Sequence, residues 1–145
     1  MTPRLPCLAC SALLTLGLFA SLGGLARAEV VAVMSASGPA IQLSKEQVAD
    51  IFLGRLHRYP DGRRPVPIDQ YEANEARAMF YDKFLGKSSA QVRAHWSKMI
   101  FTGRGKPPRQ VADGRMAKQL IAEDPNAIGY LDHIEVDATV RVVSP

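Results

Sequence analysis

The sequence of 145 residues has only two cysteines, Cys7 and Cys10, and both lie before residue 29. Residues 29–145 therefore form no disulfide, and they contain neither a thiolate nucleophile nor a cysteine-based metal site. Residues 1–28 lack acidic residues, since none of the 14 in the chain lies there. The N-terminal segment thus differs in composition from the rest of the chain.

Residues 1–28 follow the pattern of a secretory signal peptide. A single positive charge at Arg4 precedes an apolar stretch, and the small-residue triplet Ala26-Arg27-Ala28 ends the segment. Residues 5–25 carry no charge, which leaves an uncleaved membrane anchor as the alternative. Proline and glycine interrupt that stretch, which favours cleavage near Ala28 and a periplasmic or secreted location.

Residues 29–145 have the composition of one globular domain. The whole chain is 47% hydrophobic and 22% charged, which is ordinary for a folded protein. Two of the 18 lysines and arginines lie before residue 29, so the domain carries a net charge of +2 rather than +4. A domain of 117 residues can bury enough apolar surface to fold alone, but it is too short for two full lobes around a cleft.

The hydrophobic pattern predicts strands and helices that alternate through most of the domain. Short apolar runs predict strands, and capping residues followed by apolar residues at helical spacing predict helices. The expected strands are residues 30–34, 66–69, 127–131 and 139–143. The expected helices run from 45 to the stop at Gly54, from 73 to 85, from 88 through 100, and from 115 to 123. This order favours an α/β fold with a small mixed sheet flanked by about four helices.

No group of residues in the sequence has the pattern of a catalytic or metal site. His57, His95 and His133 lie far apart and lack the i, i+4 spacing of a metal-binding helix. No Walker-type loop or dinucleotide fingerprint is present, and the acidic residues are distributed as solvated faces require. Because nothing indicates a nucleophile with a base and an orienting group, we expect no enzymatic activity, no cofactor and no metal.

A basic segment spans residues 55–64. It is interpreted either as a solvated loop or as a surface attracted to an acidic partner or an anionic membrane. Nucleic acid does not fit, because the chain is expected to leave the cytoplasm and no aromatic ladder accompanies the charges. If the segment binds a partner, the candidate residues are Arg55, Arg58, Arg63 and Arg64.

Four groups of residues carry a family resemblance. They are residues 44–54 (SKEQVADIFLG), 67–80 (Pro-Ile leading into a helix with Arg77 and Phe80), 96–103 (Trp96, then Phe-Thr-Gly) and 125–130 (PNAIGY). In this order they resemble the periplasmic phosphate-binding proteins of ABC importers, and in particular the short single-lobe members. The resemblance implies one lobe of a type 2 periplasmic-binding-protein fold and a solute-binding role linked to transport.

The resemblance also implies where an anion would bind, and the sequence departs from the family there. Two-lobed members place an arginine and then Ser-Gly-Thr at the start of the helix that carries Phe80, so that N–H groups, hydroxyls and a guanidinium surround the anion. This chain has Gln70 in place of the arginine and residues 74–76 (Asn-Glu-Ala) in place of the triplet. Glu72 and Glu75 add negative charge at this helix start. We therefore expect a degenerate anion clamp.

Two functions remain open at this point. A solute-binding-like protein would bind phosphate or another small anion at the loops after the first two strands. A second copy of the chain could complete the cleft as a homodimer, since one lobe leaves a ligand half-exposed. Its candidate ligand-binding residues are Ser35, Ser37, Gly38, Gln70, Asn74 and Arg77. Alternatively, an interaction module that binds no ligand would dock on a membrane transporter or sensor through the basic segment.

Overall fold

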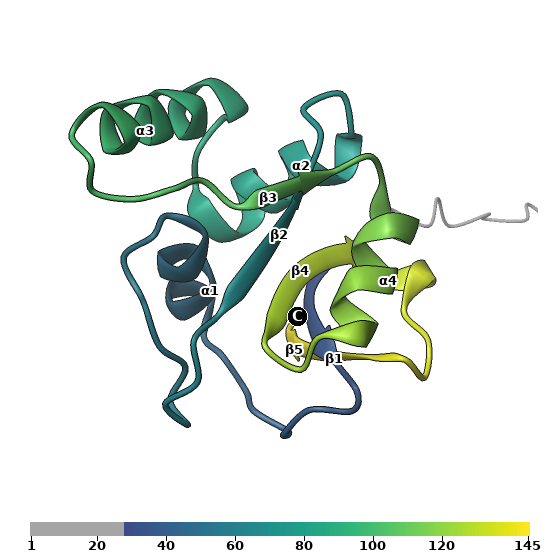
Figure 1. The fold of residues 1–145 in the computed structure, drawn as a ribbon. Coiled ribbons are helices and arrows are strands. Elements are labelled where there is room, and N and C mark those ends of the chain that lie inside the picture. The colour runs from purple at the N-terminus through teal and green to yellow at the C-terminus, as the bar shows by residue number, and fades with distance from the viewer. Residues whose placement is uncertain (1–27) are drawn as a thin grey trace, which may run out of the picture.

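The computed structural model describes residues 28–145, so the signal-peptide prediction for residues 1–28 falls almost entirely outside it. The described part contains five strands in one sheet and four α-helices (Figure 1). The strands are β1 (Val30–Ser35), β2 (Val66–Gln70), β3 (Arg109–Val111), β4 (Ala127–Asp132) and β5 (Val140–Ser144). The α-helices are α1 (Lys45–Phe52), α2 (Glu75–Phe80), α3 (Ser89–Phe101) and α4 (Gly114–Glu123). A π-helical turn, η1 (Tyr81–Leu85), continues α2, and a 3-10 turn, η2 (His133–Glu135), follows β4.

The sheet is mixed, and its strands lie in the order β3-β2-β4-β1-β5. β2 runs parallel to both β3 and β4, whereas β1 runs antiparallel to β4 and β5. The predicted α/β class, with a small mixed sheet and four helices, is therefore confirmed. A consequence for the site is that β2, β3 and β4 end at one edge of the sheet, while β1 ends at the opposite edge.

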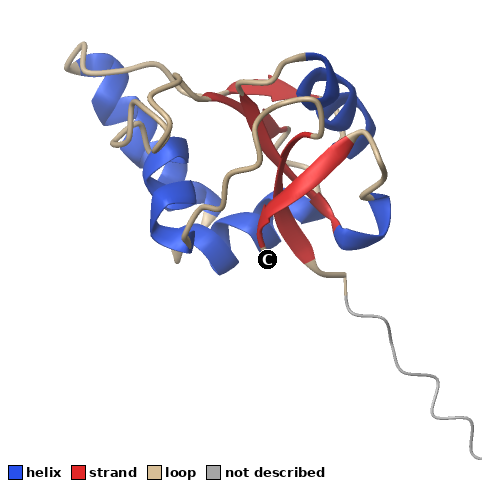
Figure 2. Ribbon diagram, turned by 90° about the horizontal axis from the view of Figure 1, so that it is seen from below, coloured by secondary structure: helices blue, strands red, loops and turns tan. Residues whose placement is uncertain are grey.

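α1 and α2 cover one face of the sheet and α4 covers the other (Figure 2). β1 is buried on both faces, as strands covered on both sides are. Val30, Ala32 and Met34 pack with α1 and α2 on one face. Val31 and Val33 pack with α4 on the other. The sheet thus separates two hydrophobic cores.

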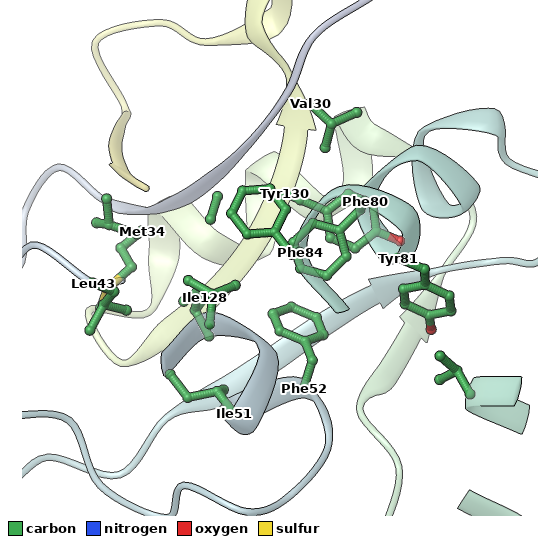
Figure 3. Packing of buried hydrophobic residues seen from close by; sticks show 14 of the residues in the cluster. Val30, Met34, Leu43, Ile51, Phe52, Phe80, Tyr81, Phe84, Ile128 and Tyr130 are labelled. Carbon is green, nitrogen blue, oxygen red and sulfur yellow. The ribbon is translucent and has the colours of Figure 1, made fainter. Parts of the chain in front are cut away.

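Aromatic rings form the centre of the core on the α1 and α2 face (Figure 3). Phe80 stacks on Tyr130 with ring centroids 4.1 Å apart, and Phe52 meets the edge of Phe80 at 4.7 Å. Aromatic pairs of this kind add about 0.5–1.5 kcal/mol each beyond the area that they bury. These contacts fix α2 against β4, and they position the polar residues at the end of the neighbouring strand.

The helices begin close to the residues that the sequence predicts. Ser44 forms a capping box with Gln47 at the start of α1, and Ser88 forms one with Gln91 at the start of α3. The helix expected over residues 73–85 is shorter at its start and changes to π-helical turns after Phe80. The three-residue strand β3 was not predicted, because so short a run carries no hydrophobic period.

α3 lies apart from the sheet at the upper left of Figure 1. Its buried residues are Val92 and Trp96. The helical spacing of the apolar residues predicts that Ile100 and Met116 face the core. This prediction is wrong, because Ile100 is 57% exposed at the end of α3 and Met116 in α4 is 48% exposed. The Trp96 ring packs against Gly54, where an added Cβ would come within 2.8 Å of the ring. α3 is thus held to the rest of the fold through few side chains.

Candidate functional site

A cluster of buried polar side chains lies at the carboxyl end of β2. Asp69, which was expected on a solvated face, is instead 2% exposed. Its carboxylate accepts hydrogen bonds from Arg77 Nε at 3.2 Å, the Tyr81 hydroxyl at 2.5 Å and the Tyr130 hydroxyl at 2.7 Å. A buried carboxylate needs such partners because its desolvation is otherwise very unfavourable. We call these four residues the Asp69 cluster.

The surroundings of Arg77, Tyr81 and Tyr130 in the Asp69 cluster keep these three groups protonated. Burial is the largest single influence on the pKa of Arg77 and lowers it, but the Asp69 charge, the neighbouring tyrosines and the hydrogen bond to Asp69 together raise it by more, so the net shift is upward. Burial and the Asp69 charge both raise the pKa of Tyr81 and of Tyr130. The two tyrosines therefore remain hydrogen-bond donors, and neither they nor Arg77 are suited to release a proton near neutral pH.

Two of the sequence-predicted ligand residues, Gln70 and Asn74, bond to each other. Asn74 Nδ2 donates to Gln70 Oε1 at 2.8 Å, and Gln70 Nε2 donates to the Tyr130 carbonyl at 3.0 Å. Gln70 is only 1% exposed. Both side-chain groups of Gln70 are thus engaged within the fold, next to the Asp69 cluster, where they fix the turn between β2 and α2.

The structure does not bring Ser35, Ser37 and Gly38 to the same place as Gln70, Asn74 and Arg77. Because β1 runs antiparallel to β4, its carboxyl end lies at the opposite edge of the sheet from that of β2. Ser35 Oγ is 2.7 Å from Ser37 Oγ, and it donates to the Ala122 carbonyl at 3.0 Å. The two loops that the sequence grouped as one surface are therefore separate.

A hollow of about 290 Å³ lies at the start of α2, where the family resemblance places the anion clamp. Asn74, Glu75 and Ala76 line it on one side, and Asp132 and Glu135 line it on another. No lysine or arginine is among its lining residues in the described chain. We call it the acidic hollow, and its three carboxylates give it a negative potential.

A second hollow, of about 270 Å³, lies between α3, the end of β2 and the segment that leads into β3. Its lining includes Arg77 and Trp96, which we use to name it the Trp96 hollow. Arg77 Nη1 and Trp96 Nε1 are buried, and neither has a hydrogen-bond acceptor within the protein. The Arg77 side chain is only 7% exposed. Two buried donors without an acceptor beside one hollow are unusual, since such groups are nearly always paired.

The basic segment contributes to a third hollow, of about 360 Å³. Four of its lining side chains can carry a positive charge, and no Asp or Glu is among the lining residues. These four are His57, Arg58, Arg64 and Lys106. We call it the basic hollow. It shares Trp96 and Pro108 with the Trp96 hollow, so the two lie side by side.

The other two arginines of the basic segment serve the fold. Arg63 pairs with Asp61 at 2.7 Å, and its guanidinium donates to the Pro125 carbonyl at 2.6 Å, which fastens the loop to the start of β4. Arg55 lies 3.6 Å from Asp50 in an exposed ion pair. Of the four candidate residues, only Arg58 and Arg64 line the basic hollow.

The described residues 28–145 contain no group of three or more His, Asp or Glu side chains arranged to hold a metal ion. None of the helices in that part of the chain is both long and apolar enough to cross a membrane.

No protein-family model and no curated protein sequence matches the chain, whereas several solved structures match its fold. One is a protein from Clostridium perfringens, described as a phosphate ABC transporter substrate-binding protein with bound phosphate. It has 18% identity and a TM-score of 0.63, over 80% of this chain and 44% of that one. An ABC-type phosphate transport receptor from Vibrio cholerae has 15% identity and a TM-score of 0.62, over 80% and 45%. PstS from Borrelia burgdorferi has 11% identity and a TM-score of 0.60, over 81% of this chain and 47% of that one.

The fold is that of one lobe of a phosphate-binding protein. The resemblance drawn from the sequence is thereby confirmed for the fold. This chain spans less than half the length of each of the three proteins. At identities of 18% or less the likeness concerns the arrangement of the elements, so the ligand of this lobe has to be argued from its own side chains.

The residues of the Asp69 cluster and the Trp96 hollow that were not among the sequence-predicted site residues are Asp69, Tyr81, Tyr130 and Trp96. Asp69 follows Ile68 at the end of a strand, where polar residues commonly lie in loops, and only the packing of α2 shows that it is buried. The one available signal was Arg77, a charge placed one turn before Phe80 on an otherwise inward-facing stripe.

Proposed function

We propose that the chain is a periplasmic solute-binding-like protein related to the phosphate-binding components of ABC transporters, with a degenerate anion clamp. In this proposal residues 1–28 direct export and are cleaved near Ala28. The proposal is supported by the fold and by the signal-peptide pattern of the N-terminal segment. It assigns no catalytic role, because the Asp69 carboxylate is occupied by four hydrogen-bond donors, three of them side chains and one the backbone N–H of Gln70.

The acidic hollow is the main support for the degenerate anion clamp in this proposal. A phosphate ion at the start of α2 would meet Glu75, Asp132 and Glu135 and no lysine or arginine among the lining residues. Carboxylates that line one hollow disfavour the binding of an anion there by several kcal/mol, where solvent is partly excluded. Gln70, in place of the family's arginine, is neutral and bonded within the fold. We therefore infer that the lobe does not retain phosphate at this place.

Calorimetry with phosphate and sulfate tests this inference. We expect no saturable heat at millimolar concentration from the unmodified protein. A variant with the family's triplet, Asn74→Ser with Glu75→Gly and Ala76→Thr, removes one carboxylate and adds two hydroxyls, so it should gain measurable phosphate binding. Saturable binding of one phosphate per chain by the unmodified protein would contradict the loss of the clamp.

The basic hollow favours a second function, an interaction module that docks on a membrane transporter or sensor. Arg58, Arg64 and Lys106 are exposed and line one hollow that contains no carboxylate. Such a surface attracts acidic segments over a distance of about 10 Å at 0.1 M salt. The occupant that fits it is an acidic stretch of a transporter or sensor at the membrane.

A polyglutamate peptide serves as the probe for this second function. The peptide should bind at low salt and be released at high salt. Arg58→Glu with Arg64→Glu should abolish this binding. The control variant, Arg109→Glu with Arg115→Glu, makes the same change in net charge at exposed positions outside the basic hollow. Equal loss of binding in both variants would show that only net charge matters and would overturn a specific docking surface.

A further inference from the structure

We propose that the Trp96 hollow binds a small organic monocarboxylate with an apolar body. This inference rests on the proposed function, because it assumes that the lobe still binds a solute, and it adds the chemical class of that solute. It places that solute at α3 and the end of β2, away from the acidic hollow at the start of α2.

The two unpaired donors define the polar end of the ligand. Arg77 and Trp96 come from different helices and both line this hollow, and each has one buried donor nitrogen, Nη1 and Nε1, that has no acceptor within the protein. Leaving a buried donor without an acceptor costs about 1–3 kcal/mol, and more for a charged group. An indole N–H can only donate, and a guanidinium can only donate. The complementary group is therefore an acceptor with two oxygens, which a carboxylate supplies.

The charges around the hollow limit the ligand to one negative charge. Arg77 is already paired with Asp69 at 3.2 Å, so its positive charge is largely balanced. At the rim, Glu72 and Arg93 form an exposed ion pair that balances in the same way. A phosphate dianion would meet no net positive charge here. A monocarboxylate bound through hydrogen bonds requires less compensation.

The remaining walls define the apolar body of the ligand. The side chains that a ligand body would touch, besides Trp96, are Val92, Ile100, Pro107 and Pro108. The volume of about 270 Å³ lies just below the range of sites for drug-sized ligands, which begins at about 300 Å³. The hollow thus suits a compact aliphatic or ring-bearing acid with few atoms.

The fluorescence of Trp96 provides a direct test, because this residue is the only tryptophan in the chain. The purified protein is titrated with cyclohexanecarboxylate and butyrate, and in parallel with cyclohexanecarboxamide, phosphate and sulfate. We expect a saturable change in emission with cyclohexanecarboxylate and a much weaker response to the uncharged amide. No saturable response to either carboxylate would overturn the inference.

Two variants separate a ligand-binding role of Trp96 from a structural one. Trp96→Phe removes an N–H that has no partner in the fold and leaves a smaller ring in the core, so it should lower thermal stability, and calorimetry should show cyclohexanecarboxylate binding weakened about tenfold or more. Tyr59→Phe is the matched control, since its hydroxyl donates to the Asn126 carbonyl at 2.8 Å outside the hollow. That change should lower stability and leave the ligand affinity unchanged. Unchanged affinity in Trp96→Phe would contradict the proposal.

Two variants of Ile100 with opposite charges keep the test decisive if Trp96→Phe disturbs the packing of α3. Ile100 is 57% exposed and lines the hollow, so its substitution leaves the core intact. Ile100→Glu should weaken binding of the carboxylate severalfold more than Ile100→Lys, because both variants lose an apolar contact and only the glutamate repels the ligand. Equal affinities in the two variants would place the carboxylate elsewhere. A response to phosphate instead of the carboxylates would overturn the proposed function as well, whereas no response to any ligand would overturn only this inference.

Discussion

Arg77 and Asp69 form an ion pair that is almost completely buried, with Nε 3.2 Å from Oδ2 and side chains 7% and 2% exposed. The pair joins the second turn of α2 to the last residues of β2. It also fixes the guanidinium of Arg77, a residue that lines the Trp96 hollow and whose buried Nη1 has no acceptor within the protein. One ion pair thereby links the packing of the fold to its candidate binding site.

Removing one partner of this pair should destabilise the protein strongly. Asp69→Asn leaves the Arg77 charge buried without compensation, for which losses of about 3–5 kcal/mol in the free energy of unfolding are typical. Glu72→Gln breaks the exposed pair with Arg93 and should lower that free energy by less than about 1 kcal/mol. Denaturant-induced unfolding of both variants checks the difference. Similar losses in the two would contradict the burial of the Asp69 cluster.

The packing of the Trp96 ring should require a glycine at position 54. The residue has φ of +68°, and an added Cβ would lie 2.8 Å from Trp96 Cη2. Gly54→Ala should combine backbone strain with overpacking and lower the free energy of unfolding by about 3 kcal/mol. Gly62→Ala, at φ of +89° with open space around it, should lower it by about 1 kcal/mol through strain alone. A shift of Trp96 emission only in Gly54→Ala would confirm the contact, and equal effects would disprove it.

Alkaline pH should destabilise the fold through its buried tyrosines. The pKa values of Tyr59, Tyr81 and Tyr130 are raised above the ordinary value of 10.0, mainly by burial. Below pH 10 both the folded and the unfolded state hold these protons, so the full stability is present. Above pH 10 the unfolded state releases them first, and stability falls by up to about 1.4 kcal/mol per pH unit for each tyrosine. Urea unfolding at pH 8 to 11 measures this fall, and a flat profile would exclude it.

Much of the fold follows from local sequence signals. The capping boxes at Ser44 and Ser88 mark two helix starts because their hydrogen bonds are made within four residues. The apolar runs of β1 and β4 mark buried strands in the same local way. β3 was missed because it is defined by pairing with β2 and has no pattern of its own.

The site could be predicted less well, because it depends on strand direction and on contacts between distant residues. The sequence suggested one surface built from Ser35 and Gln70, and the antiparallel course of β1 separates them. The side-chain partners of Asp69 are 8, 12 and 61 residues away in the chain, so their convergence has no local signature. The departure from the family's Ser-Gly-Thr, in contrast, was visible in the sequence at residues 74–76.

Thermal unfolding of the purified protein with and without millimolar phosphate, at constant ionic strength, tests the central claim most directly. A ligand at about 100 times its dissociation constant adds about 2.7 kcal/mol, which raises Tm by several degrees in a domain of this size. We predict that phosphate leaves Tm unchanged, because the hollow at the start of α2 carries Glu75, Asp132 and Glu135 where an anion would bind. A rise of several degrees with phosphate would contradict the account.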